Sequence, residues 1–441
     1  MTLIGGYVSA YYPPRICVYL HEQIRGVFYF ANHQTIYYSD RLPREMIYYL
    51  TLLIDNNFMP KPKKKDYNKL ALALHKKLKG KLGVVSKGSL KTVDDWSTMY
   101  SPGVGAVSAH LYKKPSDARE YTTKRNTVAV VSDGSAVLGL GNIGPLGALP
   151  VMEGKAAIFK EMANVDAWPI VLDTQDTEEI ISVVKAIAPG FGGINLEDIA
   201  APRCFEIEER LKAELDIPVM HDDQHGTAIV VLAGLINAAK VVEKRWEKLR
   251  VVVVGAGAAG RAIVNILLQA GVQEIIVTDS TGAIYAGRPG LSGYKKQLAE
   301  VTNTQRLSGD VMTVVEGSDV IIGVSGPGTI APAHIEKMAP QPIVFALANP
   351  IPEIMPDDAK RAGAAVVATG RSDYPNQINN ALVFPGIFRG ALDRGVRDIT
   401  DEMKVAAAEK LAKLVKKPTA EMIVPSLNDP KLVKTVASAI K

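Results

Sequence analysis

The chain from residue 127 onward alternates short apolar runs with longer amphipathic segments. Segments 177–188 and 203–215 have the pattern of helices. Short buried strands that alternate with helices predict a parallel sheet with right-handed crossovers, so the expected fold class is α/β. The predicted strands end in acidic residues: "TVAVVSDG" at Asp133, "PIVLDTQD" at Asp173, "GGINLEDI" at Glu197 and Asp198, and "IPVMHDD" at Asp222 and Asp223.

Two of these acidic pairs are one strand-helix unit apart, Glu197 with Asp198 and Asp222 with Asp223. Parallel strands end at one edge of the sheet, where ligands bind, and neighbouring strands lie about 5 Å apart. Four carboxylates at that spacing repel one another, and a divalent cation is the simplest remedy. Oxygen ligands favour Mg²⁺ or Mn²⁺ over zinc. The alternative is that the acids are solvent-exposed caps, with Thr227 or Asp223 capping a helix predicted over 227–243.

A second unit begins with the stretch "LRVVVVGAGAAGRAIVNILLQAGVQEIIVTDS". Gly255, Gly257 and Gly260 follow a four-valine strand, open an apolar helix and lead to a strand that ends in Asp279. This is the pattern of a Rossmann-type dinucleotide-binding unit, in which glycines let the backbone approach the pyrophosphate and the acid holds ribose hydroxyls. Asp279 favours NAD over NADP, although Arg288 or a nearby lysine would offset that preference.

Three further strands are predicted in this second unit, within "DVIIGVSGPG", "PIVFALANP" and "AAVVATGRSDYP". Ser325 and Asn349 lie at strand ends on the binding edge. Two interpretations of these residues stay open, because each is also a common turn former. They are candidates for contact with cofactor or substrate.

Length and composition narrow the class of protein. A chain of 441 residues predicts two domains, and a net charge of +5 is modest for that length. The lysine-rich stretch after residue 60 is interpreted as a solvated linker and helix face, so no nucleic-acid partner is expected. The only two cysteines, Cys17 and Cys204, exclude a disulfide framework and a cysteine-rich zinc site. The longest early apolar run, "MIYYLTLLI", is too short for a membrane span, so a soluble cytoplasmic protein is expected.

The first 60 residues differ from the rest, since they hold nine of the sixteen tyrosines without a clear period. The stretch "PKPKKK" at residues 60–65 is interpreted as the boundary of this segment. We expect an N-terminal extension over 1–65, to which the sequence assigns no role.

With these segments in hand, the chain resembles the malic enzymes of the short bacterial and archaeal type, over about residues 66–441. Seven segments in the family's order carry the resemblance: "YSPGVG" at 100–105, "VLGLGNIGPLGALPVMEGKAAIFK" at 137–160, "INLEDI", "MHDDQHGTA", "GAGAAG", "ALANPIPE" and "PNQINNALVFPG". The resemblance implies oxidative decarboxylation of L-malate to pyruvate and CO₂, with NAD or NADP and with Mg²⁺ or Mn²⁺. It also implies a homodimer or a higher homo-oligomer.

The resemblance also implies a role for individual residues. Lys155 would be the general base and Tyr100 the general acid, with Asp222 a polar neighbour in the catalytic set. The residues carried over for binding are Glu197, Asp198 and Asp223 for the metal, Asn349, Asn379 and Asn380 for malate or the nicotinamide edge, and Gly255, Ala256, Gly257, Ala259, Gly260, Asp279 and Ser325 for the dinucleotide. A lysine base must be neutral, so the pKa of Lys155 is expected to be lowered by burial and nearby positive charge.

One departure from the family matters for substrate binding. The larger eukaryotic enzymes carry an arginine after "SDG" that grips the substrate, whereas Ala136 stands there in this chain. Carboxylate recognition would then rest on asparagines, backbone N–H groups, the metal or a partner subunit. The expected domains are 66–225 for substrate and metal, 226–375 for the dinucleotide, and 376–441 packing back on the first.

Two other functions compete with this expectation. A malolactic enzyme would keep NAD bound and release lactate from malate. A catalytically silent NAD-binding regulatory protein is the alternative from another class, and the presence of Tyr100, Lys155 and all four acids argues against it.

Overall fold

The computed structural model describes residues 29–31, 35–37 and 66–441. The chain divides into two compact units, residues 1–77 and 78–441. The described residues of the first unit include the antiparallel strands β1 (Tyr29–Ala31) and β2 (Thr35–Tyr37) and nearly all of helix α2 (Tyr67–Leu78). Apart from β1 and β2, the expected N-terminal extension lies outside the described residues.

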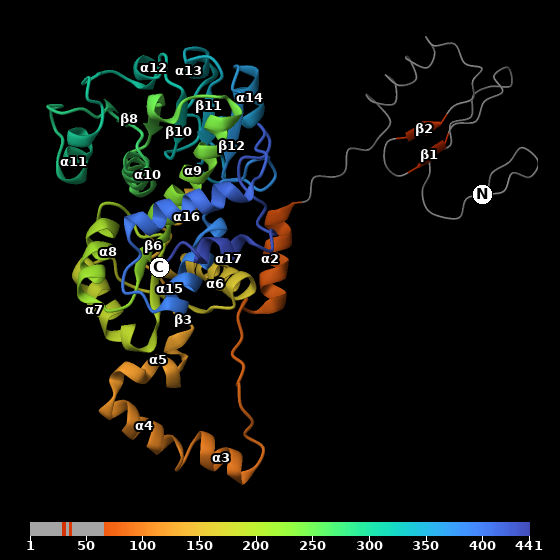
Figure 1. The fold of residues 1–441 in the computed structure, drawn as a ribbon, viewed down its shortest axis with the longest axis vertical. Coiled ribbons are helices and arrows are strands. Elements are labelled where there is room, and N and C mark those ends of the chain that lie inside the picture. The colour runs from red at the N-terminus through yellow and green to blue at the C-terminus, as the bar shows by residue number, and fades with distance from the viewer. Residues whose placement is uncertain (1–28, 32–34, 38–65) are drawn as a thin grey trace, which may run out of the picture. The chain divides into compact units, whose positions relative to one another are not determined.

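A four-stranded parallel sheet with the order β4-β3-β5-β6 forms one half of the second unit (Figure 1). The four predicted strands are confirmed, and so are the helices between them. The elements of this half are β3 (Thr127–Ser132), α6 (Gly144–Ala163), β4 (Asp166–Val171), α7 (Thr177–Ile187), β5 (Gly193–Leu196), α8 (Arg203–Glu214), β6 (Val219–His221) and α9 (Asp222–Val241).

Both faces of this sheet are covered by helices, which explains why its strands are largely apolar. On β3, Val128 and Val130 belong to the core that includes α6, whereas Ala129 and Val131 face a second core formed with α7 and α8. Successive strand residues point to opposite faces, so a strand buried on both sides has no polar face. The sheet's carboxyl edge is therefore the place where polar side chains can gather.

A six-stranded sheet with the order β12-β11-β10-β7-β8-β9 forms the other half, parallel except for β9. Helices again cover both faces. This Rossmann-like arrangement confirms the predicted second parallel sheet. Its elements are β7 (Arg250–Val254), α10 (Ala258–Gln269), β8 (Glu274–Asp279), β9 (Gly282–Ala283), α11 (Gly293–Val301), α12 (Val311–Val314), β10 (Val320–Gly323), α13 (Pro332–Glu336), β11 (Ile343–Ala346), α14 (Pro356–Arg361) and β12 (Val366–Thr369).

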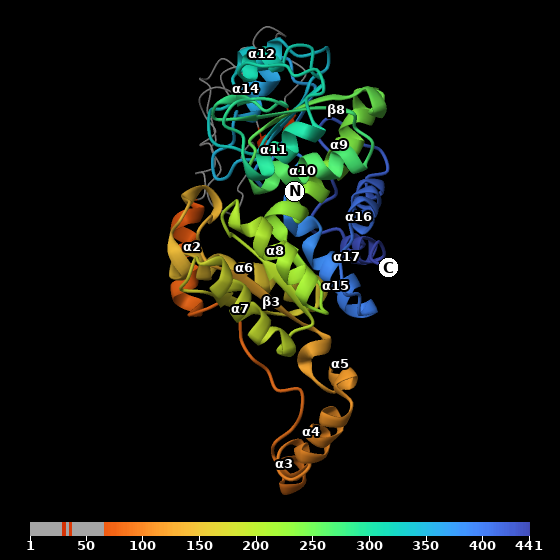
Figure 2. The same ribbon diagram turned by 90° about the vertical axis from the view of Figure 1, so that its left-hand side faces the viewer.

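Helix α9 joins the two halves, because its apolar side chains lie in one buried core with residues of both sheets. Three C-terminal helices complete that core: α15 (Phe384–Arg394) packs on α6 and β5, α16 (Asp401–Leu414) packs on α9 and α10, and α17 (Leu432–Ala437) packs on α15 and α16 (Figure 2). The chain thus returns after the second sheet to cover the first. The exact domain limits stay a prediction.

Helices α3 (Val93–Met99) and α4 (Val104–Lys113) extend away from the sheets of the second unit in both views, followed by α5 (Ala118–Tyr121) (Figures 1 and 2). Neither α3 nor α4 has a buried residue. We call residues 93–113 the α3–α4 arm. The described 3₁₀ helices are η1 (Pro115–Asp117), η2 (Thr123–Arg125), η3 (Leu138–Leu140), η4 (Ala188–Gly190), η5 (Trp246–Lys248) and η6 (Asn380–Leu382).

Among the helices that the structure describes, none combines the length and the apolar character needed to span a bilayer.

Candidate active site

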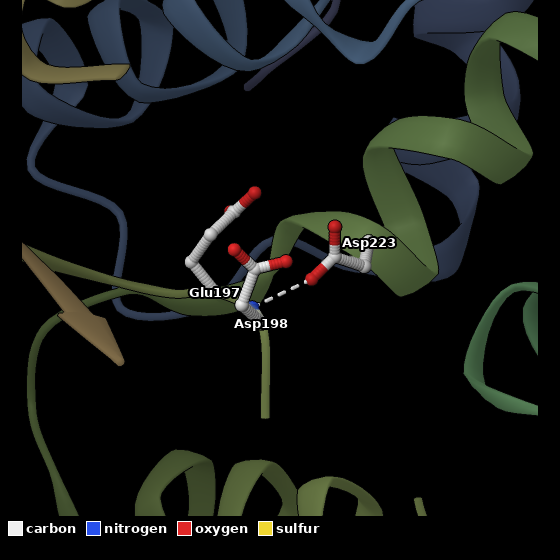
Figure 3. Close-up of side chains that lie close together, drawn as sticks. All are labelled: Glu197, Asp198 and Asp223. Atoms are coloured by element: carbon white, nitrogen blue, oxygen red, sulfur yellow. Dashed lines mark hydrogen bonds between the residues drawn. The ribbon is translucent and has the colours of Figure 1, made fainter. Parts of the chain in front are cut away.

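Three carboxylates meet at the carboxyl edge of the first sheet (Figure 3). Glu197 and Asp198 follow β5, and Asp223 lies in the first turn of α9, directly after the neighbouring strand β6. One ligand oxygen from each lies within 4.8 Å of the others. The backbone N–H of Asp198 donates to Oδ2 of Asp223 over 2.8 Å. The predicted metal ligands are therefore brought together, because β5 and β6 are paired.

The charges of this cluster fit a divalent cation. Glu197 and Asp198 are 3% and 4% exposed, so solvent does little to screen them. Burial, and then the charge of Asp223, raise the pKa of Glu197 well above its ordinary value. Like charges crowded in a dry site favour a bound cation, and carboxylate oxygens suit Mg²⁺ or Mn²⁺. The donor set thus fits the metal that the sequence predicted.

The capping alternative for this acidic stretch is wrong. Helix α9 begins at Asp222, five residues earlier than predicted, and its N-cap is His221, which makes no side-chain capping bond. Asp222 and Asp223 therefore lie inside the first turn, where the helix dipole favours negative charge. Thr227 lies further along the helix and cannot cap it.

Lys155 lies at the centre of the acidic residues. It comes from α6, is 7% exposed, and its Nζ pairs with Oε1 of Glu197 and Oδ2 of Asp222. Its Nζ also lies 4.6 Å from the ring centroid of Phe384. Burial by itself lowers the pKa of Lys155, but the charges of Asp222, Glu197 and Asp223 outweigh burial and raise it. These anions thus act against the expected lowering of the pKa, which counted the positive charge of a bound metal.

Tyr100 is not brought to this cluster. It is the residue that ends α3 and it is 65% exposed on the α3–α4 arm. Its backbone bonds stay local, to Trp96 and Val104. Within residues 78–441, the proposed acid and the proposed base thus lie on separate parts of the fold.

The segment before α15 reaches the cluster from the far end of the chain. A Cβ atom placed on Gly226 would lie 1.9 Å from Oδ1 of Asp222 and 3.0 Å from Cβ of Asn380, so both residues pack against that glycine. Asn379 instead turns its side chain to its own backbone, accepting from Ala381 N–H over 2.9 Å. Asn380 is therefore near Asp222, and Asn379 serves as the cap of η6.

The glycine turn of the second sheet has the geometry that close approach of a pyrophosphate requires. Gly255 has φ +122°, and a Cβ on Gly260 would lie 2.0 Å from the Gly255 carbonyl oxygen. A Cβ on Gly257 would meet nothing within 4 Å, so that side of the turn is open. Ala256, Ala259 and the start of α10 belong to the same turn, and α10 has no side-chain cap. Its free N–H groups fit a phosphate.

Glu353, which the sequence analysis did not single out, joins Ser325 to Ala348, the residue before Asn349. The fully buried carboxylate of Glu353 accepts from Ser325 N–H over 2.8 Å and from Ala348 N–H over 3.0 Å. The side chain of Ser325 also lies beside Gly255, since a Cβ atom placed on Gly255 would lie 3.3 Å from Cβ of Ser325. Glu353 could have been found as the last residue of the segment "ALANPIPE".

Asp279 ends β8 as predicted, but its carboxylate is not free. Arg288 donates to both oxygens, over 3.0 Å and 2.7 Å, and Lys295 donates over 2.7 Å. Burial by itself raises the pKa of Asp279, but the hydrogen bonds from Arg288 and Lys295 hold it below the usual range. The cations that would offset the preference of Asp279 for NAD are therefore present, as the sequence analysis left open.

Glu208 contacts three polar residues beside the metal cluster through its carboxylate. This buried side chain of α8 accepts from His221 N–H over 2.9 Å and from Gln224 over 3.1 Å, and it lies 3.0 Å from the ring of His225. Burial by itself raises its pKa, but the interactions with His225, Lys404 and His221 together lower the pKa to about 2. No local signal marks Glu208, because it lies on a helix far from the motif that it holds.

Comparison with known proteins agrees with this geometry. Residues 79–212 match the family described as "Malic enzyme, N-terminal domain", and residues 224–441 match "Malic enzyme, NAD binding domain". The chain is 58% identical to the NAD-dependent malic enzyme of Geobacillus stearothermophilus, over 82% of this chain and 76% of that protein. It is 53% identical to the bifunctional malic/malolactic enzyme of Bacillus subtilis, over 84% and 91% of the two chains.

A solved structure is similar in the same way. The NAD-dependent malic enzyme from Thermotoga maritima matches with a TM-score of 0.82 and 50% identity, over 84% of this chain and 98% of that one. Among the similar proteins are enzymes named as NAD-dependent and as NADP-dependent. Both halves of the fold are thus matched, and this chain belongs to the malic enzyme family.

Proposed function

We infer that this chain oxidises and decarboxylates L-malate to pyruvate and CO₂, with NAD or NADP as the oxidant. Its family, the acidic cluster and the open glycine turn support this activity together. The observation that carries the catalytic assignment is the buried contact of Lys155 with both Glu197 and Asp222, beside the three proposed metal ligands.

We propose that Glu197, Asp198 and Asp223 hold Mg²⁺ or Mn²⁺ and that the turn from Gly255 to Gly260 holds the dinucleotide, with Ala256, Ala259 and Ser325 lining it. When bound, the metal polarises the hydroxyl oxygen of the substrate and the dinucleotide accepts the hydride from C2. With Glu197 engaged as a ligand, Lys155 loses part of the negative charge that holds its proton, and burial then favours the neutral amine.

Neutral Lys155 takes the proton of the C2 hydroxyl as hydride leaves C2. Asp222 is its remaining anionic partner, so it orients the amine and stabilises the ammonium that forms. The bond between C3 and the adjacent carboxylate then breaks, CO₂ leaves, and its electron pair stays on C3 as the enolate. Tyr100 donates a proton to C3 and pyruvate is formed. Asn380, with Asn349, is proposed to bind the substrate or the nicotinamide edge, whereas the local bond of Asn379 supports only a minor role.

We further propose that the enzyme is a homo-oligomer and that Tyr100 acts in the site of a second copy. The α3–α4 arm supports this proposal, because it exposes large apolar side chains, with Val93 81%, Trp96 52% and Tyr112 88% exposed. Such a surface is typical of an interface. An arm that docks on a partner would bury these residues and would carry Tyr100, as the general acid of the reaction, to the carboxylate cluster of the partner.

A steady-state assay of malate oxidation with NAD and NADP tests the activity. Net NADH or NADPH with pyruvate is expected. Lactate without net reduced cofactor would indicate the malolactic reaction, and no turnover would indicate a silent protein.

Two variants test the roles of the acid and the base. Lys155→Ala should lose single-turnover NADH formation, and Tyr100→Phe should lose proton exchange at C3 of pyruvate, each by about 10²- to 10⁴-fold. Tyr100→Phe with normal C3 exchange, or Lys155→Ala with normal NADH formation, would refute the corresponding role.

Mixing the two inactive variants tests whether the site is shared between copies. In a dimer that pairs Lys155→Ala with Tyr100→Phe, one shared site keeps both natural residues, so about a quarter of the wild-type activity should return after random exchange of subunits. If each site is built from one chain, the mixture stays inactive. Light scattering of the wild type provides the oligomeric state independently.

A further inference from the structure

A cavity of about 400 Å³ lies between α8, α9, α10 and α16, which are labelled in Figure 1. It lies where the two halves of the second unit meet, because α8 covers the first sheet and α10 covers the second. Small-molecule sites are typically cavities of about 300 to 1,000 Å³, and junctions of this kind commonly hold them. Among the described residues that line this cavity, none belongs to the proposed metal, substrate or dinucleotide sites.

Arg261, the residue after the glycine turn, lines this cavity from α10. Its guanidinium carbon lies 4.4 Å from the centroid of the Phe205 ring, and that ring packs against Tyr294 with 4.8 Å between the ring centroids. Within the part of the chain that the structure describes, the guanidinium makes no hydrogen bond or ion pair. Its N–H donors are therefore available to a planar anion such as a carboxylate, which accepts two parallel hydrogen bonds from arginine.

The acids that line the cavity are either already paired or exposed to water. Glu208 accepts from three donors, as described above, and Asp401 accepts from Lys404 over 2.9 Å and from Gln269 over 2.7 Å. Glu209 is exposed, so water screens its charge. The buried ammonium of Lys404 uses one of its three N–H donors for Asp401. The unused hydrogen-bonding capacity around the cavity is thus mainly that of donors, which favours an anionic ligand.

The cavity and the metal cluster share the first turn of α9. Gln224 and His225 line the cavity, and Asp223, the residue before them, is a proposed metal ligand. Glu208 also lines the cavity and contacts both Gln224 and His225. A ligand that fills the cavity would therefore hold in place the turn that presents Asp223 to the metal.

We propose that this cavity binds a small organic carboxylate with an apolar body, and that this ligand and the metal strengthen each other's binding through the first turn of α9. Arg261 and Lys404 meet the carboxylate, and the lining residues Phe205 and Ile266 contact the apolar body. Coupling of two ligands is reciprocal, so each raises the affinity of the other by the same factor. Only the coupling rests on the proposed function.

An NMR titration of benzoate with the full-length chain, without metal, malate or dinucleotide, tests the carboxylate site. Benzamide is the matched probe, because it has the same ring and no charge. Benzoate should bind at least about tenfold more tightly than benzamide, and Arg261→Gln should lose this difference. Arg306→Gln should behave as wild type, because Arg306 is exposed and its side chain makes no hydrogen bond or ion pair within the described residues.

Three results would overturn the carboxylate site. The first is equal affinity of the wild type for benzoate and benzamide, or an unchanged difference in Arg261→Gln. The second is tighter binding of inorganic phosphate than of benzoate, which would assign the cavity to another anion. The third is displacement of benzoate by NAD, which would show that the cavity is part of the dinucleotide site.

Titration of Mn²⁺ with and without saturating benzoate tests the coupling. Benzoate should tighten Mn²⁺ binding by at least about fivefold. Glu208→Gln should reduce this factor and bind benzoate at least as tightly as wild type, because it removes a negative charge and keeps the size of the side chain. Equal Mn²⁺ affinity with and without benzoate would overturn the coupling. A chain that binds benzoate but not Mn²⁺ would refute the proposed metal site together with the coupling, and the carboxylate site would stand.

Discussion

The backbone N–H of Asp198 donates to the carboxylate of Asp223 over 2.8 Å and so joins the ends of two neighbouring strands (Figure 3). Asp198 has φ +53°, a left-handed backbone conformation that non-glycine residues rarely adopt. The turn after β5 is thus shaped so that Glu197, Asp198 and Asp223 converge. The carboxylates repel one another in this arrangement, and it is kept by backbone geometry and by the pairing of β5 with β6.

Removal of the metal should abolish turnover and lower the thermal midpoint, because the three carboxylates then lack a counter-charge. Asp223→Asn should weaken Mn²⁺ affinity by at least about tenfold, since it removes one charged ligand. Titration calorimetry with Mn²⁺ measures this directly. Asp173→Asn, at an exposed position after β4, serves as the matched control. Full activity in excess chelator would contradict the metal site.

Asp222→Asn should move the acidic limb of the pH-rate profile to lower pH. Asp222 raises the pKa of Lys155, and the base must lose its proton before it can act, so activity rises as the pH passes that pKa. Removal of the Asp222 charge lowers the pKa and the limb follows, by about 1 to 3 pH units. The logarithm of kcat/KM against pH is the measurement. A limb that stays in place, or moves to higher pH, would show that another group titrates.

Gly226→Ala should disturb the site without touching the proposed ligands. The new methyl would lie 1.9 Å from Oδ1 of Asp222 and 3.0 Å from Asn380, so both must move. Displacements of this size cost about 10²-fold in rate, and overpacking costs about 1 to 3 kcal/mol in stability. Kinetics and chemical denaturation measure the two effects. Gly190→Ala is the control, because a methyl there meets nothing within 4 Å.

Alanine substitutions at two glycines of the dinucleotide turn should have different effects. Gly260→Ala drives its methyl to 2.0 Å from the Gly255 carbonyl oxygen, so both folding stability and dinucleotide binding should fall. Gly257→Ala points into open space, so its thermal midpoint should stay near wild type while dinucleotide affinity drops at the approach of the phosphates. Thermal unfolding with and without NAD separates the two. Equal destabilisation of the unliganded variants would contradict the assignment of the open side.

The sequence by itself determined the strands and the edge of the sheet at which the functional residues gather. Apolar runs fixed the strands because both faces of each sheet are buried, and acidic residues at the ends of β5 and β6 had to meet once those strands paired in parallel. The four-valine run followed by glycines likewise located Gly255 at the end of β7. These features depend on local pattern and on chain direction, which a sequence displays.

Only the tertiary structure decided which side chains face one another across elements. Lys155 meets Asp222 and Glu197 because α6 packs on β3 and β4 with that side chain buried, and the two carboxylates raise its pKa although burial by itself lowers it. The same holds for Arg288 and Lys295 around Asp279. The α3–α4 arm, which leaves Tyr100 in solvent, is the clearest case, since a motif indicates which chemistry a residue can perform but not which part of the fold its side chain reaches.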